Sequence, residues 1–393
     1  MALGAGHFRG LLRYCYLGGL EANRGTSMNL SPAQTDQILT PALLLDLDAL
    51  EQNLDITLAR LGGNPDRWRP HVKTAKLLIT MQRMVARGIV NFKCATTLEL
   101  TTVCEAGARD VLVAFPATGA RARRIREIAA AHPGVTISVL VESEEQLALI
   151  ADSPIGAFVD INPGLDRTGL NQAGAEKLAG LVKAIESRGI RFRGLHYYDG
   201  HHRQPDLRDR QAAAFAGYDR LMTLAAQCRP GEVITSGTPA MPCALAYQPF
   251  CSAGFVHRVS AGTVVYNDLT SLEQMSDWKY RPAVMVLATV ISHPTPDLIT
   301  CDAGHKSVSA DAGDPTCAAW NHPALIAQHP SEEHLPMRIP AGAAVPELGD
   351  LLYLVPKHVC PTVNNFDDVL LVSGGKIVGM ERVTARGHEA PLR

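Results

Sequence analysis

Short runs of β-branched and apolar residues alternate with longer amphipathic segments from residue 70 to about residue 275. In the segment 173–187, Leu178, Leu181, Val182 and Ile185 recur at three- and four-residue spacing, which predicts a helix with one buried face. Further helices are predicted at 119–131, 143–151 and 207–226. The predicted strands are 70–73, 92–95, 111–115, 136–141, 157–161, 193–198, 233–236 and 256–262.

Eight strands with helical segments between them imply parallel strands joined by right-handed crossovers. Over about 200 residues, this α/β pattern predicts a closed (β/α)8 barrel, in which the active site lies at the carboxyl ends of the strands. An open doubly wound sheet would carry a glycine-rich fingerprint after its first strand, and this sequence has none there.

After Lys279 the pattern changes to strands separated by glycine, proline and aspartate turns, which predicts a second, all-β domain. Its strands are expected at 283–291, 298–302, 350–355 and 369–378, with a hairpin turn at Gly374-Gly375 and an extra strand at 40–46. We therefore expect a barrel over 47–278 and a β domain over 279–393 with 40–46. Residues 1–27 are expected to be a disordered extension, or to precede a true start at Met28; a targeting peptide is the alternative.

Composition excludes several classes of function. The 393 residues are 46% hydrophobic and 19% charged with a formal net charge of −2, so no basic field is available for nucleic acid or an anionic membrane. No apolar run reaches the ~18 residues that a membrane span needs. The nine cysteines are scattered and odd in number, which argues against a secreted disulfide framework and favours a cytoplasmic location.

Two charged residues follow predicted strands of the barrel. Lys73 ends the first strand within Arg-Pro-His-Val-Lys-Thr, where desolvation would lower its pKa and favour a Schiff base. A surface lysine at a strand end is the alternative. Arg167 follows the fifth strand and could donate a hydrogen bond to a cofactor ring nitrogen, or could form an ion pair.

Other polar residues follow the last three strands. The loop after the sixth strand contains Tyr198, His201 and His202, and histidines at this density favour proton transfer over a purely structural role. Loops after strands seven and eight commonly bind phosphate in barrels, through backbone N–H groups and hydroxyls. The residues that we predict to bind a cofactor phosphate there are Ser236, Gly237, Thr238, Gly262 and Thr263.

The β domain carries His358 and Cys360 within Val-Pro-Lys-His-Val-Cys-Pro-Thr. An imidazole and a thiolate two residues apart on an extended chain can both face one metal ion. Two protein ligands leave coordination positions open for water and substrate, as a catalytic metal requires. A buried cysteine beside an unrelated histidine is the alternative interpretation.

Taken together, the motifs resemble the D-threonine aldolase and D-serine dehydratase family of fold-type-III pyridoxal-phosphate enzymes. The matching segments are 40–48, 69–74, the Arg167 loop, 198–201, 236–239 and 358–362. The resemblance implies an alanine-racemase-like barrel and a β domain, Lys73 as the Schiff-base lysine and Arg167 on the ring nitrogen. It also implies a divalent metal, zinc or manganese, at His358 and Cys360, where it would bind the β-hydroxyl of a D-amino acid. Because such enzymes commonly close their sites with a neighbouring subunit, a homodimer is expected.

Three positions depart from the aldolase pattern. Aldolases typically carry an aspartate at the position of Cys360, whereas the dehydratases carry a cysteine there. Gln204 occupies the place of a histidine, although His201 and His202 are close. At the position of Ala75, a histidine is often found. The expected reaction is retro-aldol cleavage to glycine and an aldehyde. The alternative is β-elimination from D-serine or 3-hydroxy-D-aspartate to a keto acid and ammonia. An amino-acid racemase and a non-catalytic pyridoxal-phosphate carrier are further alternatives, but neither accounts for the metal pair.

Overall fold

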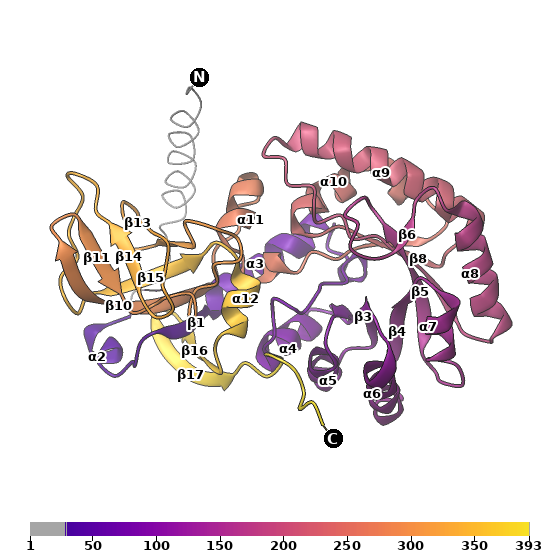
Figure 1. Cartoon of the computed structure of the whole chain (residues 1–393), viewed down its shortest axis with the longest axis horizontal. Helices are drawn as coiled ribbons and strands as arrows, with labels where there is room; N and C mark the ends of the chain where they lie inside the picture. The colour runs from indigo at the N-terminus through magenta and orange to yellow at the C-terminus, as the bar shows by residue number, and fades with distance from the viewer. Residues whose placement is uncertain (1–27, 29, 393) are drawn as a thin grey trace. The chain divides into compact units, whose positions relative to one another are not determined.

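The computed structural model describes residue 28 and residues 30–392, and it divides into two compact units (Figure 1). The barrel unit comprises residues 58–262 and 387–392. The β unit comprises residue 28, residues 30–57 and residues 263–386. Residues 1–27, for which we predicted an extension, lie outside the described residues.

The barrel unit is built on a parallel sheet whose strands follow one another in sequence order. The order is β2 (Asn91–Cys94), β3 (Asp110–Pro116), β4 (Thr136–Val141), β5 (Gly156–Asn162), β7 (Phe192–His196), β8 (Glu232–Thr235) and β9 (Val256–Val259), with β6 (Leu170–Asn171) beside β5. Leu112, Leu140, Phe158 and Ile234 come from four of these strands and form one buried cluster. Each strand thus contributes alternate side chains to the interior.

The predicted first strand, 70–73, is not a regular strand. It is reduced to two parallel bridges, Trp68 to Val259 on β9 and His71 to Lys93 on β2. The Arg69 N–H donates to the Val259 carbonyl at 2.9 Å, and the Lys93 N–H donates to the Pro70 carbonyl at 2.9 Å. Pro70 has no N–H to extend the ladder, which explains why the strand is interrupted. The segment still joins the two edge strands, as the eighth strand of a barrel does.

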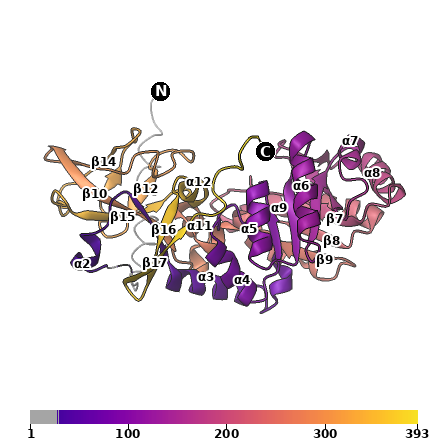
Figure 2. The same ribbon diagram turned by 90° about the horizontal axis from the view of Figure 1, so that it is seen from below.

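Helices connect the strands of the barrel unit. They are α4 (Leu78–Ala86), α5 (Thr97–Glu105), α6 (Gly119–Ala131), α7 (Glu144–Ala148), α8 (Ala175–Ser187), α9 (Leu207–Cys228) and α10 (Met241–Ala246). The four helices expected from the sequence are all present, and α8 buries the four apolar residues that predicted its inner face. Figure 2 shows α5 and α6 side by side. No helix among the described residues is long and apolar enough to cross a membrane.

The β unit has one large sheet of mainly antiparallel strands in the order β13-β14-β11-β10-β1-β16-β17, with β15 pairing β10 and β12. Its strands are β1 (Ala42–Asp46), β10 (Val284–Thr295), β11 (Leu298–Cys301), β12 (Cys317–Ala319), β13 (Ile326–Ala327), β14 (Leu335–Arg338), β15 (Leu351–Pro356), β16 (Asp368–Ser373) and β17 (Lys376–Arg382). β1 pairs with β10 and β16, so the early strand joins the late domain as predicted. Gly374 and Gly375 have φ of 55° and 71° and form the expected turn.

The β unit also contains helices, of which α3 (Leu47–Arg60) continues along the chain into the barrel unit. The others are α2 (Pro32–Thr35), α11 (Leu269–Gln274) and α12 (Val359–Asn364). The amide of Asn53 in α3 donates to the carbonyls of Val265 and Arg281, and the Thr57 hydroxyl lies 2.9 Å from that of Tyr280. These bonds tie 47–57 and 263–278 to the β unit, whereas we had expected both segments in the barrel domain.

Candidate active site

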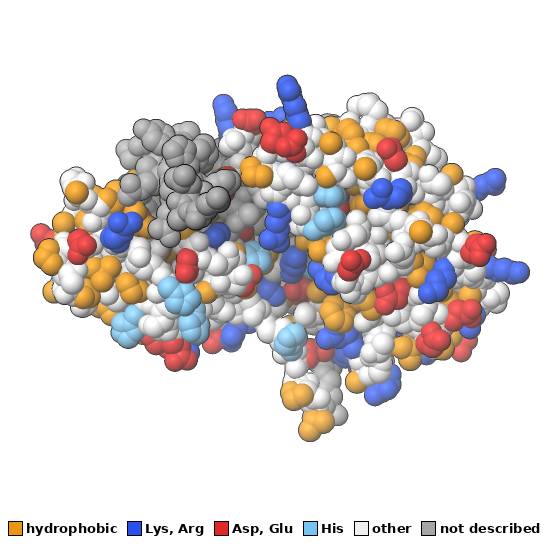
Figure 3. Space-filling model, turned by 45° about the horizontal axis from the view of Figure 1, so that its top comes forward, with side chains coloured by type: hydrophobic (Ala, Val, Ile, Leu, Met, Phe, Trp, Pro, Cys, Tyr) orange, Lys and Arg blue, Asp and Glu red, His pale blue; other side chains and the backbone are white. Residues whose placement is uncertain are grey.

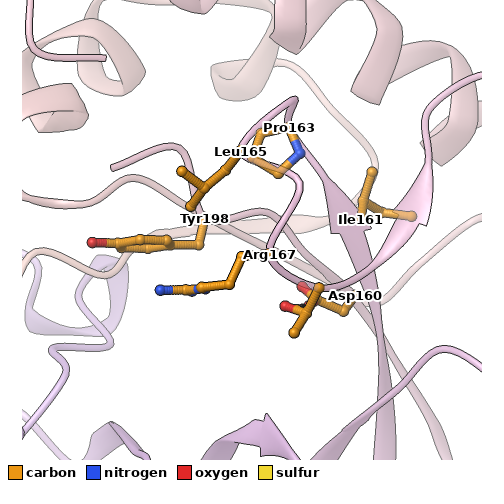
Figure 4. Close-up of a pocket in the computed structure, with 7 residues that line it drawn as sticks. Asp160, Ile161, Pro163, Leu165, Arg167 and Tyr198 are labelled. Carbon is orange, nitrogen blue, oxygen red and sulfur yellow. Dashed lines mark hydrogen bonds between the residues drawn. The ribbon is translucent and has the colours of Figure 1, made fainter. Parts of the chain in front are cut away.

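The candidate site of the barrel unit is centred on Tyr198, which follows β7. The centroid of its ring lies 4.8 Å from the Arg167 guanidinium carbon and 5.6 Å from the Lys73 Nζ atom. Figure 4 shows the guanidinium of Arg167 lying parallel to the ring of Tyr198. Because parallel strands end on one side of the sheet, three loops that are far apart in sequence bring these residues together. The negative face of an aromatic ring accommodates such cations.

Lys73 lies in a turn directly after the bridge between His71 and β2, and its side chain is half-buried. Its backbone N–H donates to His71 Nδ1 at 3.1 Å, which places the ring proton of a neutral His71 on Nε2. Burial, followed by the charges of Lys73 and Lys93, holds the pKa of His71 well below its ordinary value. His71 is therefore neutral beside the lysine predicted to form a Schiff base.

A chain of buried hydrogen bonds runs under the site. The Thr168 hydroxyl donates to Asp160 Oδ2 at 2.7 Å, and Asp160 Oδ1 lies 2.7 Å from His196 Nδ1. His196 Nε2 lies 3.2 Å from the Nζ atom of Lys93, which is 2.6 Å from the Ser260 hydroxyl. This polar layer connects the Arg167 loop with the ends of β2, β7 and β9.

The sequence analysis did not single out Lys93. Its strand reads Asn-Phe-Lys-Cys and all four residues are buried. A lysine within this apolar strand could have been noticed in the sequence. Which side chains of so short a strand point into the barrel could not be decided without the neighbouring strands.

The loop after β8 places polar groups next to Tyr198. Ser236 has φ of 64°, and its buried hydroxyl has no hydrogen-bond partner among the described residues. The Gly237 N–H donates to Asp199 Oδ1 at 3.1 Å, and a Cβ on Gly237 would lie 3.1 Å from the Tyr198 ring. Thr238 begins a short 3-10 helix, Thr238–Ala240. A buried, unsatisfied hydroxyl at this position suits an anionic group such as a phosphate.

Gly262 and Thr263, which follow β9, differ in their surroundings. A Cβ on Gly262 would lie 2.3 Å from the carbonyl oxygen of His71, so only glycine permits this close approach of the two backbones. Thr263 belongs to the β unit, where its hydroxyl lies 3.8 Å from the Cys360 sulfur. Binding of a cofactor phosphate by Gly262 and Thr263 stays a prediction.

His201 and His202 pack ring against ring, with centroids 4.1 Å apart. His201 Nδ1 and His202 Nε2 are buried and have no hydrogen-bond partner among the described residues. Burial lowers the pKa of His201 and lowers that of His202 to about 4. Both rings are neutral at neutral pH, and His202 is a weak base.

The second candidate site lies in the β unit. His358 is the N-cap of α12 and Cys360 lies in its first turn, so the expectation of an extended chain at this pair is wrong. Pro361 is tolerated in that turn because its missing N–H has no helical partner there. His358 Nδ1 lies 2.6 Å from Asp311 Oδ2. Although burial lowers the pKa of His358, hydrogen bonds that its ring donates to Cys360 and Asp311 raise it to about 9.

The His358 and Cys360 side chains are close enough for this hydrogen bond, and nitrogen and sulfur donors suit zinc. Among the described residues, no group of three or more His, Cys, Asp or Glu side chains forms a larger candidate centre. One nitrogen and one sulfur donor would leave positions of a four-coordinate metal open for water and substrate, and Asp311 fixes the imidazole.

Two family models match the chain in the order of its units. The model described as "Alanine racemase, N-terminal domain" matches residues 45–268, and the one described as "Putative serine dehydratase domain" matches residues 283–372. Because the first match covers more than half of the chain, the protein belongs to the class of proteins with an alanine racemase N-terminal domain.

Relatives narrow that class. A D-threonine aldolase from an Arthrobacter species is 30% identical over 93% of this chain and 98% of its own length. A D-threo-3-hydroxyaspartate dehydratase from Delftia sp. strain HT23 is 25% identical over 88% and 97%. The crystal structure of D-threonine aldolase from Filomicrobium marinum aligns with a TM-score of 0.81 and 28% identity, over 89% of this chain and 96% of that one.

The chain belongs to the D-threonine aldolase family. The fold class, the family and the assignment of an enzyme of the aldolase or dehydratase type are thus confirmed. The individual roles predicted for Lys73, Arg167, Tyr198, His358 and Cys360 stay predictions.

Proposed function

We propose that this protein is a lyase that cleaves β-hydroxy-D-amino acids into glycine and an aldehyde, with pyridoxal phosphate and a divalent metal as cofactors. The observation that carries the proposal is the convergence of Lys73, Arg167 and Tyr198 from three loops of the barrel unit, together with the unsatisfied hydroxyl of Ser236. A covalent amine, a ring-nitrogen donor and a phosphate-binding hydroxyl are what pyridoxal phosphate requires of a protein. The Arthrobacter relative is named a D-threonine aldolase.

Each cofactor would supply one kind of chemistry. Pyridoxal phosphate delocalises the electron pair left at the substrate's Cα when the Cα–Cβ bond breaks. A divalent metal stabilises negative charge on the β-oxygen. Lys73 would hold the first cofactor covalently, and Ser236, Gly237 and Thr238 would bind its phosphate.

The remaining residues would orient the cofactors and move protons. Arg167 stays charged at any relevant pH, so it would donate to the ring nitrogen and keep that nitrogen unprotonated. His358 and Cys360 would hold the metal. Within the loop after β7, His201 is the better placed of the two histidines to accept the β-hydroxyl proton, since it is the less buried.

β-Elimination to a keto acid and ammonia is the second candidate function. Cys360 favours it, because dehydratases of the family resembled here pair cysteine with the metal histidine. The same residues would serve, except that Lys73 would take the α-proton and the metal would assist departure of hydroxide. A racemase or a pyridoxal-phosphate carrier would leave the His358–Cys360 pair without a role.

Product analysis on D-threonine decides between these reactions. The purified enzyme is loaded with pyridoxal phosphate and either Zn²⁺ or Mn²⁺. Glycine with acetaldehyde establishes the aldolase, whereas 2-oxobutyrate with ammonia establishes the dehydratase. If none of D-threonine, D-serine and 3-hydroxy-D-aspartate is converted to the products of either reaction, the proposal is contradicted.

Three finer assignments belong to the same proposal. We expect zinc or manganese as the metal, a homodimer, and a cytoplasmic location. Charge distribution gives no support to a nucleic-acid partner: on the face drawn in Figure 3, Lys and Arg side chains are interspersed with Asp and Glu side chains. Light scattering of the purified protein tests the dimer, and metal analysis after expression tests the metal.

A further inference from the structure

Lys93 is a fully buried lysine to which the reaction described above gives no role. Its side chain lies inside the barrel unit and the residue is only 1% exposed. The Nζ atom lies 5.4 Å from the centroid of the Tyr198 ring, and Lys73 Nζ lies 5.6 Å from the same centroid. Lys93 therefore lies over the same ring as the lysine predicted to hold the cofactor, and the charge of Lys73 acts on it.

The partners of Lys93 determine what its amine can still do. The Asp160 carboxylate accepts from His196 Nδ1, which leaves Nε2 of a neutral imidazole as an acceptor. The Ser260 hydroxyl donates its proton to the Ser236 carbonyl at 2.7 Å, so its oxygen also accepts. Lys93 thus donates to His196 and to Ser260. A neutral amine keeps a lone pair beyond these two bonds, and an ammonium keeps a third N–H.

The charges around Lys93 leave it near the balance point between its two forms. Burial is the largest cause lowering its pKa, which is about 7, and the charge of Lys73 is the second. No ion pair within the described part of the chain includes Lys93 directly. The charged and titratable groups that act on it, or that bridge or hydrogen-bond to it, are Lys73, Arg167, Asp160, Asp199, His71 and His196.

Lys93 and His202 differ as proton acceptors. A group that exchanges protons efficiently has a pKa near the working pH. Lys93 meets this condition, whereas the pKa of His202 is about 4 because of its burial. The arrangement Asp160–His196–Lys93 also holds the amine in one orientation, as a base held by a third group is held in other enzymes.

We propose that Lys93 is a second acid–base residue of the candidate cofactor site. As an ammonium it gives a proton to the Cα atom of the bound amino acid when the Cα–Cβ bond breaks, and as a neutral amine it regains a proton from water. Asp160 and His196 are positioning residues in this arrangement. The inference rests on the proposed function, because it needs an amino acid bound beside Lys73. No bond other than those to the transferred proton forms or breaks at Lys93.

The titration of Lys93 can be measured directly. The chain has nine lysines, so protein labelled with ¹³C at the lysine ε-carbon gives a sparse NMR spectrum. In the enzyme loaded with pyridoxal phosphate and zinc, the signal that disappears in Lys93→Gln belongs to Lys93. We expect this signal to titrate well below the ordinary lysine value, because burial is the largest cause that lowers the pKa of Lys93. A midpoint close to the ordinary lysine value of about 10.4 would overturn the proposal.

Two substitutions separate acid–base chemistry from a structural role. Gln at position 93 can keep both donated hydrogen bonds but cannot titrate, and Arg keeps the charge but cannot release its proton. We expect both variants to lower kcat about 100-fold or more with KM little changed, and to lose the limb of the pH–rate profile near pH 7. Lys183→Gln, on the exposed side of α8, is the matched control and should leave kcat unchanged.

The results for Lys93 are distinguishable from failure of the proposed function. Suppose that Lys93→Gln shows the full absorbance of the lysine-bound cofactor and a wild-type kcat. This result contradicts only the role of Lys93 and leaves the proposed function intact. A wild-type protein that binds no pyridoxal phosphate contradicts the proposed function and this role together. If Lys93→Gln does not fold, Lys93→Arg and the wild-type titration still decide the question.

Discussion

His358 Nδ1 lies 2.6 Å from Asp311 Oδ2, although 47 residues separate them in the chain. This contact fixes the orientation of the imidazole. A carboxylate on the second nitrogen of a histidine ligand orients the ring and increases its basicity. Asp311 therefore belongs to the candidate metal site. No motif in the sequence, and no spacing relative to His358, had indicated this residue.

Asp311→Asn should weaken zinc affinity about 10- to 100-fold, because it removes the carboxylate that orients His358. Competition with a chromogenic chelator measures the change. Asp314→Asn is the control, since Asp314 contacts His329 instead. Equal zinc affinity in the Asp311 variant and the wild type would exclude a role for Asp311 at the metal.

Lys73→Ala should abolish the absorbance band near ~420 nm expected of a lysine-bound cofactor. An absorbance spectrum after loading and gel filtration tests this, and Lys183→Ala should keep the band. Survival of the full band in Lys73→Ala would show that another lysine holds the cofactor.

His358→Ala should keep the same band but lose bound metal and turnover, because its side chain is a predicted metal ligand in the β unit. Metal content and the rate of D-threonine cleavage are measured on one preparation. Full activity without bound metal would refute the metal requirement.

Arg69→Met should lower the free energy of unfolding by about 3–5 kcal/mol, because it removes a buried cation from a cluster in which Asp110 and Glu232 would keep only Arg193 and Arg258 as partners in the part of the chain that the structure describes. Arg69 is fully buried and contacts Glu232 at 2.7 Å and Asp110 at 3.0 Å. Urea denaturation measures the loss. Arg188→Met, which removes an exposed pair with Glu144, should cost less than about 1 kcal/mol. A similar loss in both variants would contradict the assignment of Arg69 as a buried structural ion.

His257 should make stability depend on pH. It is buried, its Nε2 lies 2.8 Å from the Thr235 hydroxyl, and burial lowers its pKa to about 3 from an ordinary 6.5. Because the folded pKa is depressed, the unfolded chain binds the proton first as pH falls below 6.5. The free energy of unfolding should then drop, by up to about 1.4 kcal/mol per pH unit for this one proton.

Urea denaturation at pH 7.5, 6 and 5 tests the contribution of His257. His257→Gln should remove part of this pH dependence, whereas His329→Gln, at an exposed position, should not. An unchanged slope in His257→Gln would mean that His257 is not the group responsible.

The sequence by itself determined the periodic elements and which candidate residues come together in the barrel unit. Apolar spacing placed α6 at its observed bounds and the inner face of α8, because a helix buries residues at a fixed local period. Lys73, Arg167 and Tyr198 were also accessible, since parallel strands bring their carboxyl ends to one side of a barrel whatever the loops contain.

Only the tertiary structure decided the remaining features of the two sites. The approach of Asp311 to His358 and the buried position of Lys93 both depend on contacts between residues distant in the chain. Local propensity does not contain such contacts. Burial and charge at Lys93 or His202, which set their pKa values, exist only once the strands and loops around them have assembled.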